Sequence, residues 1–312
     1  MTHHIIIGEC MVEMSGRGQH TYYQTFAGDT FNTAVYFKRS NPAQTISYWT
    51  AAGTDKISQQ FMQKLNEENI DTSLAFTSED KTLGLYMIDT DNKGERSFSY
   101  WRSDSAAKHL VSLFKQGQVV LDLTRIKSVF LSGISLAILS DEDKQSLLEM
   151  LLELKQRGCC IIFDPNYRPQ LWRSAQQAQL WTDKAYALAD IAFPGCDDHR
   201  VLYGHNSISD IQQHVTNCGV KEMVIKNGEH GIQIFSQAQH SIIPAHKVAQ
   251  VVDTTAAGDA FNGGYLAARF AGKSEQYAAG YGAKVAAYVI GHKGAIVDKE
   301  CMGEFLMANQ LS

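Results

Sequence analysis

The stretch DTTAAGDAF, residues 253–261, decides the fold. An apolar segment precedes it at residues 248–252, and residues 262–268, NGGYLAA, are typical of a helix. We therefore expect a strand that runs into a loop of small residues and then into a helix beginning at Ala257. Small residues at such a junction allow backbone amides to approach a ligand closely.

The start of this helix predicts an anion site. Its first amides have no partners inside the helix, and the helix dipole adds positive potential, so the site suits a phosphate group. A carboxylate there would bind phosphate poorly, which makes Asp259 a candidate general base that takes a proton from an attacking hydroxyl. The alternative is that Asp259 only caps the helix, since aspartate is a favoured cap.

Composition indicates a soluble globular protein. The chain has 312 residues, of which 44% are hydrophobic and 20% charged, and its formal net charge of −5 argues against nucleic acid or an anionic membrane as the main partner. No apolar run is long enough for a signal peptide or a membrane span. Six cysteines without a C-x-x-C spacing suggest reduced thiols in the cytoplasm, and eleven histidines without ligand spacing give no reason to assign a metal site.

Short β-branched runs alternate with longer helical segments along most of the chain, which predicts a parallel sheet with helices on both faces. The expected strands are residues 5–7, 47–51, 128–132, 160–164, 191–193 and 223–226. The expected helices are residues 30–40, capped by Asp29, then 58–69, 141–157 and 175–188, with 257–270 and 274–290 closing the chain.

One region departs from this alternation. Residues 83–89 and 95–101 have the period-two pattern of strands, and Asp91-Asn92-Lys93-Gly94 between them is typical of a hairpin turn. We expect an antiparallel flap that projects from the main sheet, to which residues 11–25 add further strands.

The motif D-T-x-x-A-G-D-x-F-x-x-G over residues 253–264 resembles the C-terminal signature of the ribokinase-like (PfkB) carbohydrate kinases, and residues 28–34 resemble the N-terminal signature. Within that family the chain is most similar to the 2-keto-3-deoxygluconate kinases, through GECM at 8–11, SGISLA at 132–137 and NYRP at 166–169. The resemblance implies a ribokinase-like three-layer α/β sandwich. It implies one domain over residues 1–312, with a mostly parallel central sheet and a small β lid at roughly 11–25 and 83–102.

The resemblance also implies transfer of a phosphoryl group from ATP, accompanied by Mg²⁺, to a hydroxyl of a sugar acid. Asp259 would be the catalytic base, and the amides of Ala256, Ala257 and Gly258 would form the anion hole. Physical reasoning agrees, because phosphoryl transfer needs positioning and electrostatic stabilisation more than covalent chemistry.

Further site residues follow from the same resemblance. Besides Asp259, the sugar-binding set is Gly28, Asp29, Asn32, Tyr86, Tyr100, Arg102 and Arg168. The nucleotide-binding set is Asn166, Arg168, Lys226, Gly228, Gly231, Ala256, Gly258 and Gly294. The family's N-x-x-E motif is incomplete, since Gly195 replaces its asparagine and Asp198 stands at its glutamate, so Asp198 is left unassigned.

Arg102 and Arg168 favour an acidic sugar. An arginine side chain can hold both oxygens of a carboxylate, whereas a neutral sugar would leave this charge unpaired. Tyr86 and Tyr100 also suit packing across the hairpin, and we expect Trp49 and Trp101 to pack in the core or the lid.

Three alternatives stay open: a fructokinase or ribokinase of the same family, a non-catalytic sugar sensor on the same fold, and a nicotinamide-dependent dehydrogenase. The intact Asp259 argues against the sensor, and the absence of G-x-G-x-x-G after the first strand argues against the dehydrogenase. An exposed lid sheet is unstable alone, so we expect a homodimer or a higher homo-oligomer assembled through the lid.

Overall fold

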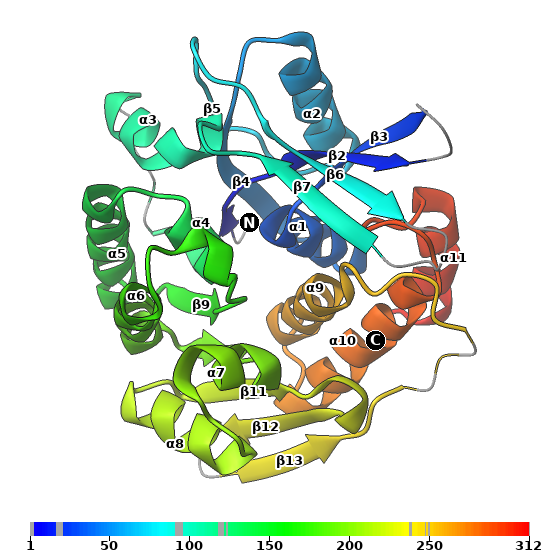
Figure 1. Cartoon of the computed structure of the whole chain (residues 1–312). Helices are drawn as coiled ribbons and strands as arrows, with labels where there is room; N and C mark the ends of the chain where they lie inside the picture. The colour runs from blue at the N-terminus through cyan, green and yellow to red at the C-terminus, as the bar shows by residue number, and fades with distance from the viewer. Residues whose placement is uncertain are drawn as a thin grey trace.

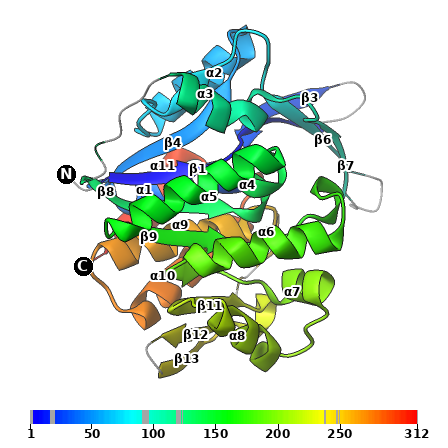
Figure 2. The same ribbon diagram turned by 90° about the vertical axis from the view of Figure 1, so that its left-hand side faces the viewer.

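The computed structural model describes residues 3–16, 21–90, 96–117, 122, 124–236, 239–246, 248 and 250–311. A nine-stranded sheet forms the centre, in the order β13-β12-β11-β10-β9-β8-β1-β4-β5. The seven strands from β11 to β5 are parallel, and β12 and β13 add antiparallel pairs at one edge. Helices cover both faces of this sheet, which gives three layers (Figure 1, Figure 2).

The elements of these layers have the following bounds. The strands of the main sheet are β1 (His3–Ile7), β4 (Thr45–Ala52), β5 (Ala75–Thr77), β8 (Ile126–Ser132), β9 (Cys160–Asp164), β10 (Ile191–Ala192), β11 (Glu222–Lys226), β12 (Ile232–Ser236) and β13 (Gln239–Ile243). The helices are α1 (Asp29–Ser40), α2 (Lys56–Glu67), α3 (Leu110–Gln116), α4 (Gly133–Ala137), α5 (Asp141–Gln156), α6 (Ala175–Leu188), α7 (Cys196–Tyr203), α8 (Ile208–Asn217), α9 (Ala257–Phe270), α10 (Glu275–Ile290) and α11 (Lys299–Ala308).

Two hydrophobic cores lie on opposite faces of the sheet. Along β1, Ile5 and Ile7 pack into one core with α3 to α8, while Ile6 packs into the other with α1, α2 and α9 to α11. This alternation explains the continuous apolar run in the sequence, because a strand buried on both faces needs apolar residues at every position.

A smaller four-stranded sheet, in the order β3-β2-β6-β7, lies beyond the carboxyl end of β1 (Figure 2). Its strands are β2 (Met11–Gly16), β3 (Tyr22–Ala27), β6 (Gly84–Thr90) and β7 (Arg96–Trp101). The predicted flap is confirmed, including the strands expected near residues 11–25. One detail differs, since β2 pairs with β6 in parallel rather than antiparallel. The predicted turn at residues 91–94 lies outside the described residues.

The prediction of alternating strands and helices is confirmed, with the bounds of α6, α9 and β9 matched at both ends. Other expectations were wrong. The described residues of 248–252 form no strand, so α9 follows irregular chain. Asp29 does not cap α1: the helix begins at Asp29 itself, Gly28 is the N-cap residue, and no side chain caps the end. A further helix, α11, follows the two that were expected to close the chain.

Candidate active site

The site forms where parallel strands end together. The carboxyl ends of β1, β9 and β11 meet at one edge of the sheet, and the residues at or after them include Glu9, Asp164 and Lys226. Helices α1 and α9 begin at the same edge and pack against each other. Open α/β sheets bind ligands at this edge, because side chains and helix N-termini converge there.

Asp259 lies in the first turn of α9 and faces α1. Its Oδ2 atom accepts a hydrogen bond of 2.8 Å from Nδ2 of Asn32. Burial, followed by the negative charge of Asp29, raises the pKa of Asp259 well above the usual range of an aspartate. The N-cap residue of α9 is Ala256, and no side chain caps this end, so the capping alternative for Asp259 is wrong.

The first amides of α9 are partly available to a ligand. The Ala257 amide donates to the Thr254 carbonyl at 3.2 Å, so this member of the predicted anion hole already has a partner. Within the described chain, no residue accepts a hydrogen bond from the amide of Gly258 or Asp259. Lys226 adds positive charge, since a Cβ at Gly258 would lie 3.8 Å from its Nζ atom. These groups suit a phosphate at the helix N-terminus.

Sequence reasoning missed Asp164, an acidic residue beside Lys226, and left Asp198 without a role. Oδ2 of Asp164 accepts hydrogen bonds of 2.6 Å from Nζ of Lys226 and from Nδ2 of Asn262. Burial, and then the charge of Asp164, raise the pKa of Asp198 to about 6. Two sequence signals could have identified these residues. Asp164 is the last residue of β9, and Asn262 follows Asp259 by three residues on α9.

The residues predicted to hold the nucleotide and the sugar are not fully separated. Asn166 was assigned to the nucleotide, yet its Nδ2 donates to Oδ2 of Asp29 at 2.8 Å, on the sugar side. Arg168 is half exposed, and its Nη1 lies 3.9 Å from Oδ1 of Asp198. At Gly28, a Cβ would lie 2.3 Å from the Glu9 carbonyl oxygen, so the close approach of α1 to the chain after β1 requires glycine.

Two carboxylates, Glu9 and Glu13, join the predicted sugar site. Arg102 donates to Glu9 Oε2, and the two side chains are 11% and 1% exposed. The prediction that a neutral sugar would leave Arg102 unpaired was therefore wrong. The Tyr86 hydroxyl donates to Glu13 Oε2, and the Tyr86 ring stacks on exposed Tyr100 with 5.8 Å between ring centres.

Several buried polar atoms at this place have no hydrogen-bond partner within the described chain, and a polar ligand would satisfy them. They are Glu9 Oε1, Asn32 Oδ1, Arg102 Nε and Asn262 Oδ1.

A cavity of about 510 Å³ lies on the other side of the first turn of α9. Polar residues line one end of it, and apolar residues of α9 and α10 line the rest, which suits a phosphate chain and a flat base. Its lining includes Lys226, Gly228, Gly231, Ala257, Gly258, Phe261, Ala283, Ala287 and Ile290. Gly294, also predicted at the nucleotide, lines a different cavity, and its amide donates to Asp253 Oδ2 at 3.0 Å.

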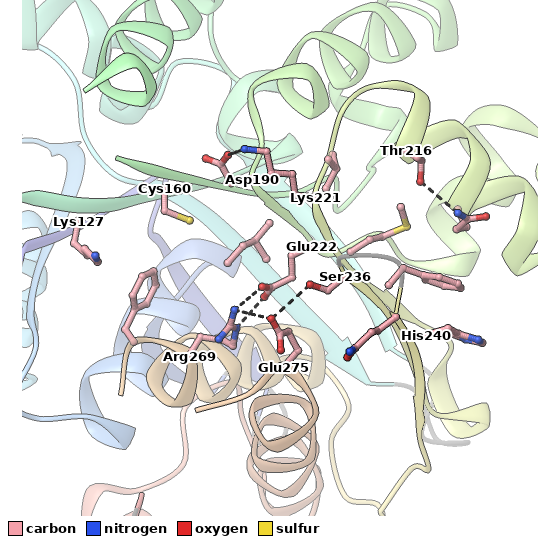
Figure 3. Close-up of a pocket in the computed structure, with 17 residues that line it drawn as sticks. Lys127, Cys160, Asp190, Thr216, Lys221, Glu222, Ser236, His240, Arg269 and Glu275 are labelled. Carbon is pink, nitrogen blue, oxygen red and sulfur yellow. Dashed lines mark hydrogen bonds and ion pairs between the residues drawn. The ribbon is translucent and has the colours of Figure 1, made fainter. Parts of the chain in front are cut away.

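A larger cavity, of about 820 Å³, contains none of the predicted site residues (Figure 3). It lies near the amino ends of β9 to β11, at the opposite edge of the sheet. Its most prominent polar group, Arg269, is held by Glu222 and Glu275 at 2.6 and 3.1 Å. The size of a cavity therefore does not identify the site in this molecule.

The pfkB family carbohydrate kinase model matches residues 1–301. The chain belongs to this family of carbohydrate kinases. It is 42% identical over 302 residues to a 2-dehydro-3-deoxygluconokinase of Escherichia coli K12, covering 95% of this chain and 97% of that protein. It is 40% identical to the enzyme of the same name from Dickeya dadantii, with the same coverage.

Among solved structures, the fructokinase of Xylella fastidiosa with bound ATP has a TM-score of 0.82 at 19% identity, covering 98% of this chain and 97% of that one. This likeness confirms the ribokinase-like fold. No helix in the described part of the carbohydrate kinase is long and apolar enough to span a membrane.

Proposed function

We propose that this carbohydrate kinase phosphorylates 2-keto-3-deoxygluconate, also called 2-dehydro-3-deoxygluconate, with ATP and releases 2-keto-3-deoxy-6-phosphogluconate. The observation that carries the proposal is the position of Asp259. Asn32 holds its carboxylate, and the amides of Gly258 and Asp259 have no acceptor in the described chain. Its neighbours Ala257 and Gly258 line the 510 Å³ cavity. The substrate assignment follows from relatives of 40–42% identity that carry this activity in their names.

Asp259 acts as general base in this proposal. A base with a raised pKa holds a transferred proton more readily, which matches its task of deprotonating a sugar hydroxyl. Asn32 orients the carboxylate through its 2.8 Å hydrogen bond. The amides of Gly258 and Asp259, from which no residue of the described chain accepts a hydrogen bond, stabilise together with Lys226 the negative charge that develops on the transferring group.

The residues present fit Mg²⁺ with ATP. Mg²⁺ prefers carboxylate oxygens together with phosphates and water, and Asp164 and Asp198 supply two acids next to Lys226. When bound, ATP provides the phosphoryl group and Mg²⁺ neutralises part of its charge. Asp164 also holds Lys226 in place through their ion pair of 2.6 Å, so it serves both the cation and the anion site.

The acidic substrate assigns a carboxylate to Arg102 and Arg168. The Glu9–Arg102 ion pair favours a second candidate, a kinase for a neutral sugar, because Arg102 already has a partner. We rank the sugar acid first because the Nε atom of Arg102 is buried without a partner in the described chain, so it can still donate to a substrate carboxylate.

The small sheet acts as a lid over the sugar in this proposal, and the protein is a cytoplasmic homodimer joined through the lids. The support for the dimer is that both edge strands of the small sheet, β3 and β7, carry exposed aromatic side chains that a second copy of the sheet could cover. These side chains are Tyr22, Tyr23, Phe98, Tyr100 and Trp101. Trp101 is 57% exposed, so it does not pack in a core of the single chain.

The test is consumption of ATP, with Mg²⁺ present, against a panel of 2-keto-3-deoxygluconate, its galactonate epimer, fructose and ribose. We expect the gluconate acid to give the highest kcat/KM, with Asp259→Asn as the inactive control. Equal or faster turnover of fructose or ribose would select the second candidate. If the protein binds ATP but turns over none of these sugars, it is a non-catalytic sugar sensor.

A further inference from the structure

A cluster of metal-ligating side chains lies away from the active site, between α6 and α8. Asp183 on α6, His214 on α8 and Cys218 after the end of α8 each offer one ligand atom, and these atoms all lie within 4.8 Å of one another. Spacing along the chain did not single out this cluster, because Asp183 lies 31 residues before His214. Only the packing of α6 near α8 brings the three together; both helices lie in the outer layer with α7 (Figure 1).

We propose that Asp183, His214 and Cys218 bind a divalent cation of the zinc class. Carboxylate, imidazole and thiolate are the three ligand types that Zn²⁺ takes from proteins. Tetrahedral bonds of roughly 2.0–2.3 Å place ligand atoms roughly 3.3–3.8 Å apart, so small side-chain rotations bring these atoms into range. Mg²⁺ prefers oxygen ligands, so it does not compete effectively for a site with a thiolate.

Neighbouring side chains hold the three ligands in position. Oδ1 of Asp183 accepts hydrogen bonds from the Tyr203 hydroxyl at 2.7 Å and from Nε2 of His214 at 2.9 Å. Cys218 follows His214 by four residues, one helical turn later. The ring of Tyr203 lies 4.3 Å from that of His214 and limits its rotation. Such outer partners fix ligand orientation in protein metal sites.

Binding of the cation releases protons from its ligands. The thiol of Cys218 and Nε2 of His214 each release a proton to solvent while His214 keeps a proton on Nδ1, and the cation then binds the thiolate, Nε2 and the carboxylate of Asp183. A fourth position goes to water, because the side chain of Asp183 is 44% exposed. The bound ion would tie α6 to α8. It would therefore stabilise the fold without taking part in phosphoryl transfer.

The experiment uses the full-length protein after treatment with a chelator. Titration with Zn²⁺ in excess Mg²⁺, followed by calorimetry, should show one equivalent bound per chain. Titration with Co²⁺ should produce the near-ultraviolet absorption of a thiolate–cobalt bond. We expect Zn²⁺ to raise the Tm, because it binds the folded state preferentially.

Variants locate the site. Cys218→Ser and His214→Gln should each weaken Zn²⁺ binding by more than 100-fold, and Tyr203→Phe by about 10- to 100-fold, the range for a lost outer partner. Cys301→Ser and His240→Gln, which change an exposed cysteine and an exposed histidine elsewhere, should bind as the parent does. Circular dichroism checks that each variant is folded.

Three outcomes would overturn the proposal: no stoichiometric Zn²⁺ binding by the parent, a Co²⁺ complex without a thiolate band, or unchanged binding in folded Cys218→Ser. Kinase turnover in Mg²⁺ is measured in parallel, and we expect it to stay within about twofold of the parent in all folded variants.

Discussion

In the proposed mechanism, Asp259 affects both catalysis and the stability of the fold. Its pKa in the folded protein is raised above the ordinary value, chiefly by burial and then by Asp29. Between the unfolded and the folded pKa, the folded state holds more protons, so this group's contribution to stability falls as pH rises. The ionised base is therefore a source of instability at the pH at which it works.

We predict that Asp259→Asn lowers kcat by about 10²- to 10⁴-fold, the range for a lost general base. It should raise the Tm by a few degrees at pH 8, because it removes a buried charge while asparagine still accepts from Asn32. The gain should be smaller at pH 5. Thermal unfolding at both pH values tests this, with Glu300→Gln on exposed α11 as the control. A variant that is less stable at pH 8 would contradict it.

Arg102 and Glu9 should affect substrate choice in opposite directions. Arg102→Ala removes a charge-assisted bond to the sugar carboxylate that contributes about 1.5–3 kcal/mol, so kcat/KM for the acid relative to a neutral sugar should fall by about 10- to 150-fold. Glu9→Gln removes the competing carboxylate and should raise that ratio. The ratio matters rather than either rate, because loss of either partner also disturbs a buried ion pair. If neither variant changes the ratio, Arg102 serves only Glu9.

For single residues, the sequence predicted which motif residues belong to the site better than it predicted their contacts. Asp259, Asn32 and Lys226, which the motifs singled out, lie together at one edge of the sheet, and their roles stay predictions. Sequence reasoning missed Asp164, whose importance depends on two partners 62 and 98 residues away. Pairings over such distances follow from packing rather than from spacing along the chain.

Elements with clearly buried faces were predicted better than elements with mostly exposed residues. Strand β9 and helices α6 and α9 were predicted to the residue, because buried faces leave a clear apolar period. Strand β13 was missed: its five residues are exposed or half-buried, so no apolar alternation shows. Helix α11 was missed because Met302 is its one fully buried residue.

The lid strands provide a test at this scale. We predict that amides of β6 and β7 exchange hydrogen more slowly when the sugar acid is bound, because ligand contacts at Tyr86 and Arg102 order these strands. Mass-spectrometric exchange with and without the sugar measures the effect. Strand β9, in the centre of the main sheet, should show no change and serves as the internal control. Equal protection of β6 and β7 in both states would show a rigid wall.

For the whole molecule, the exposed aromatic side chains of β3 and β7 predict the assembly. We expect Trp101→Glu together with Tyr100→Glu to shift the protein from dimer to monomer in analytical ultracentrifugation at micromolar concentration. A charge placed in an apolar interface is desolvated without a partner. Met307→Glu, at a residue 68% exposed on α11, is the matched control. A parent protein that is already monomeric would contradict the prediction.

The small sheet joins the rest of the chain at four places: residues 8–10 before β2, Gly28 after β3, residues 78–83 before β6, and residues 102–105 after β7. The first two connections press against each other, since Gly28 has no room for a Cβ beside Glu9. Because four connections attach the small sheet to the rest of the chain, we expect it to tilt as a unit and not to open fully. No residue of its strands lines the 510 Å³ cavity.

In the proposed function the sugar binds under the small sheet and the nucleotide in the 510 Å³ cavity, so we expect separate openings, of which a tilted lid closes only the one for the sugar. ADP should be able to leave and ATP to enter while the sugar stays enclosed. Equilibrium binding of ATP, measured with and without sugar acid, should accordingly give dissociation constants within about threefold of each other. A nucleotide that binds only before the sugar would show that the lid controls both openings.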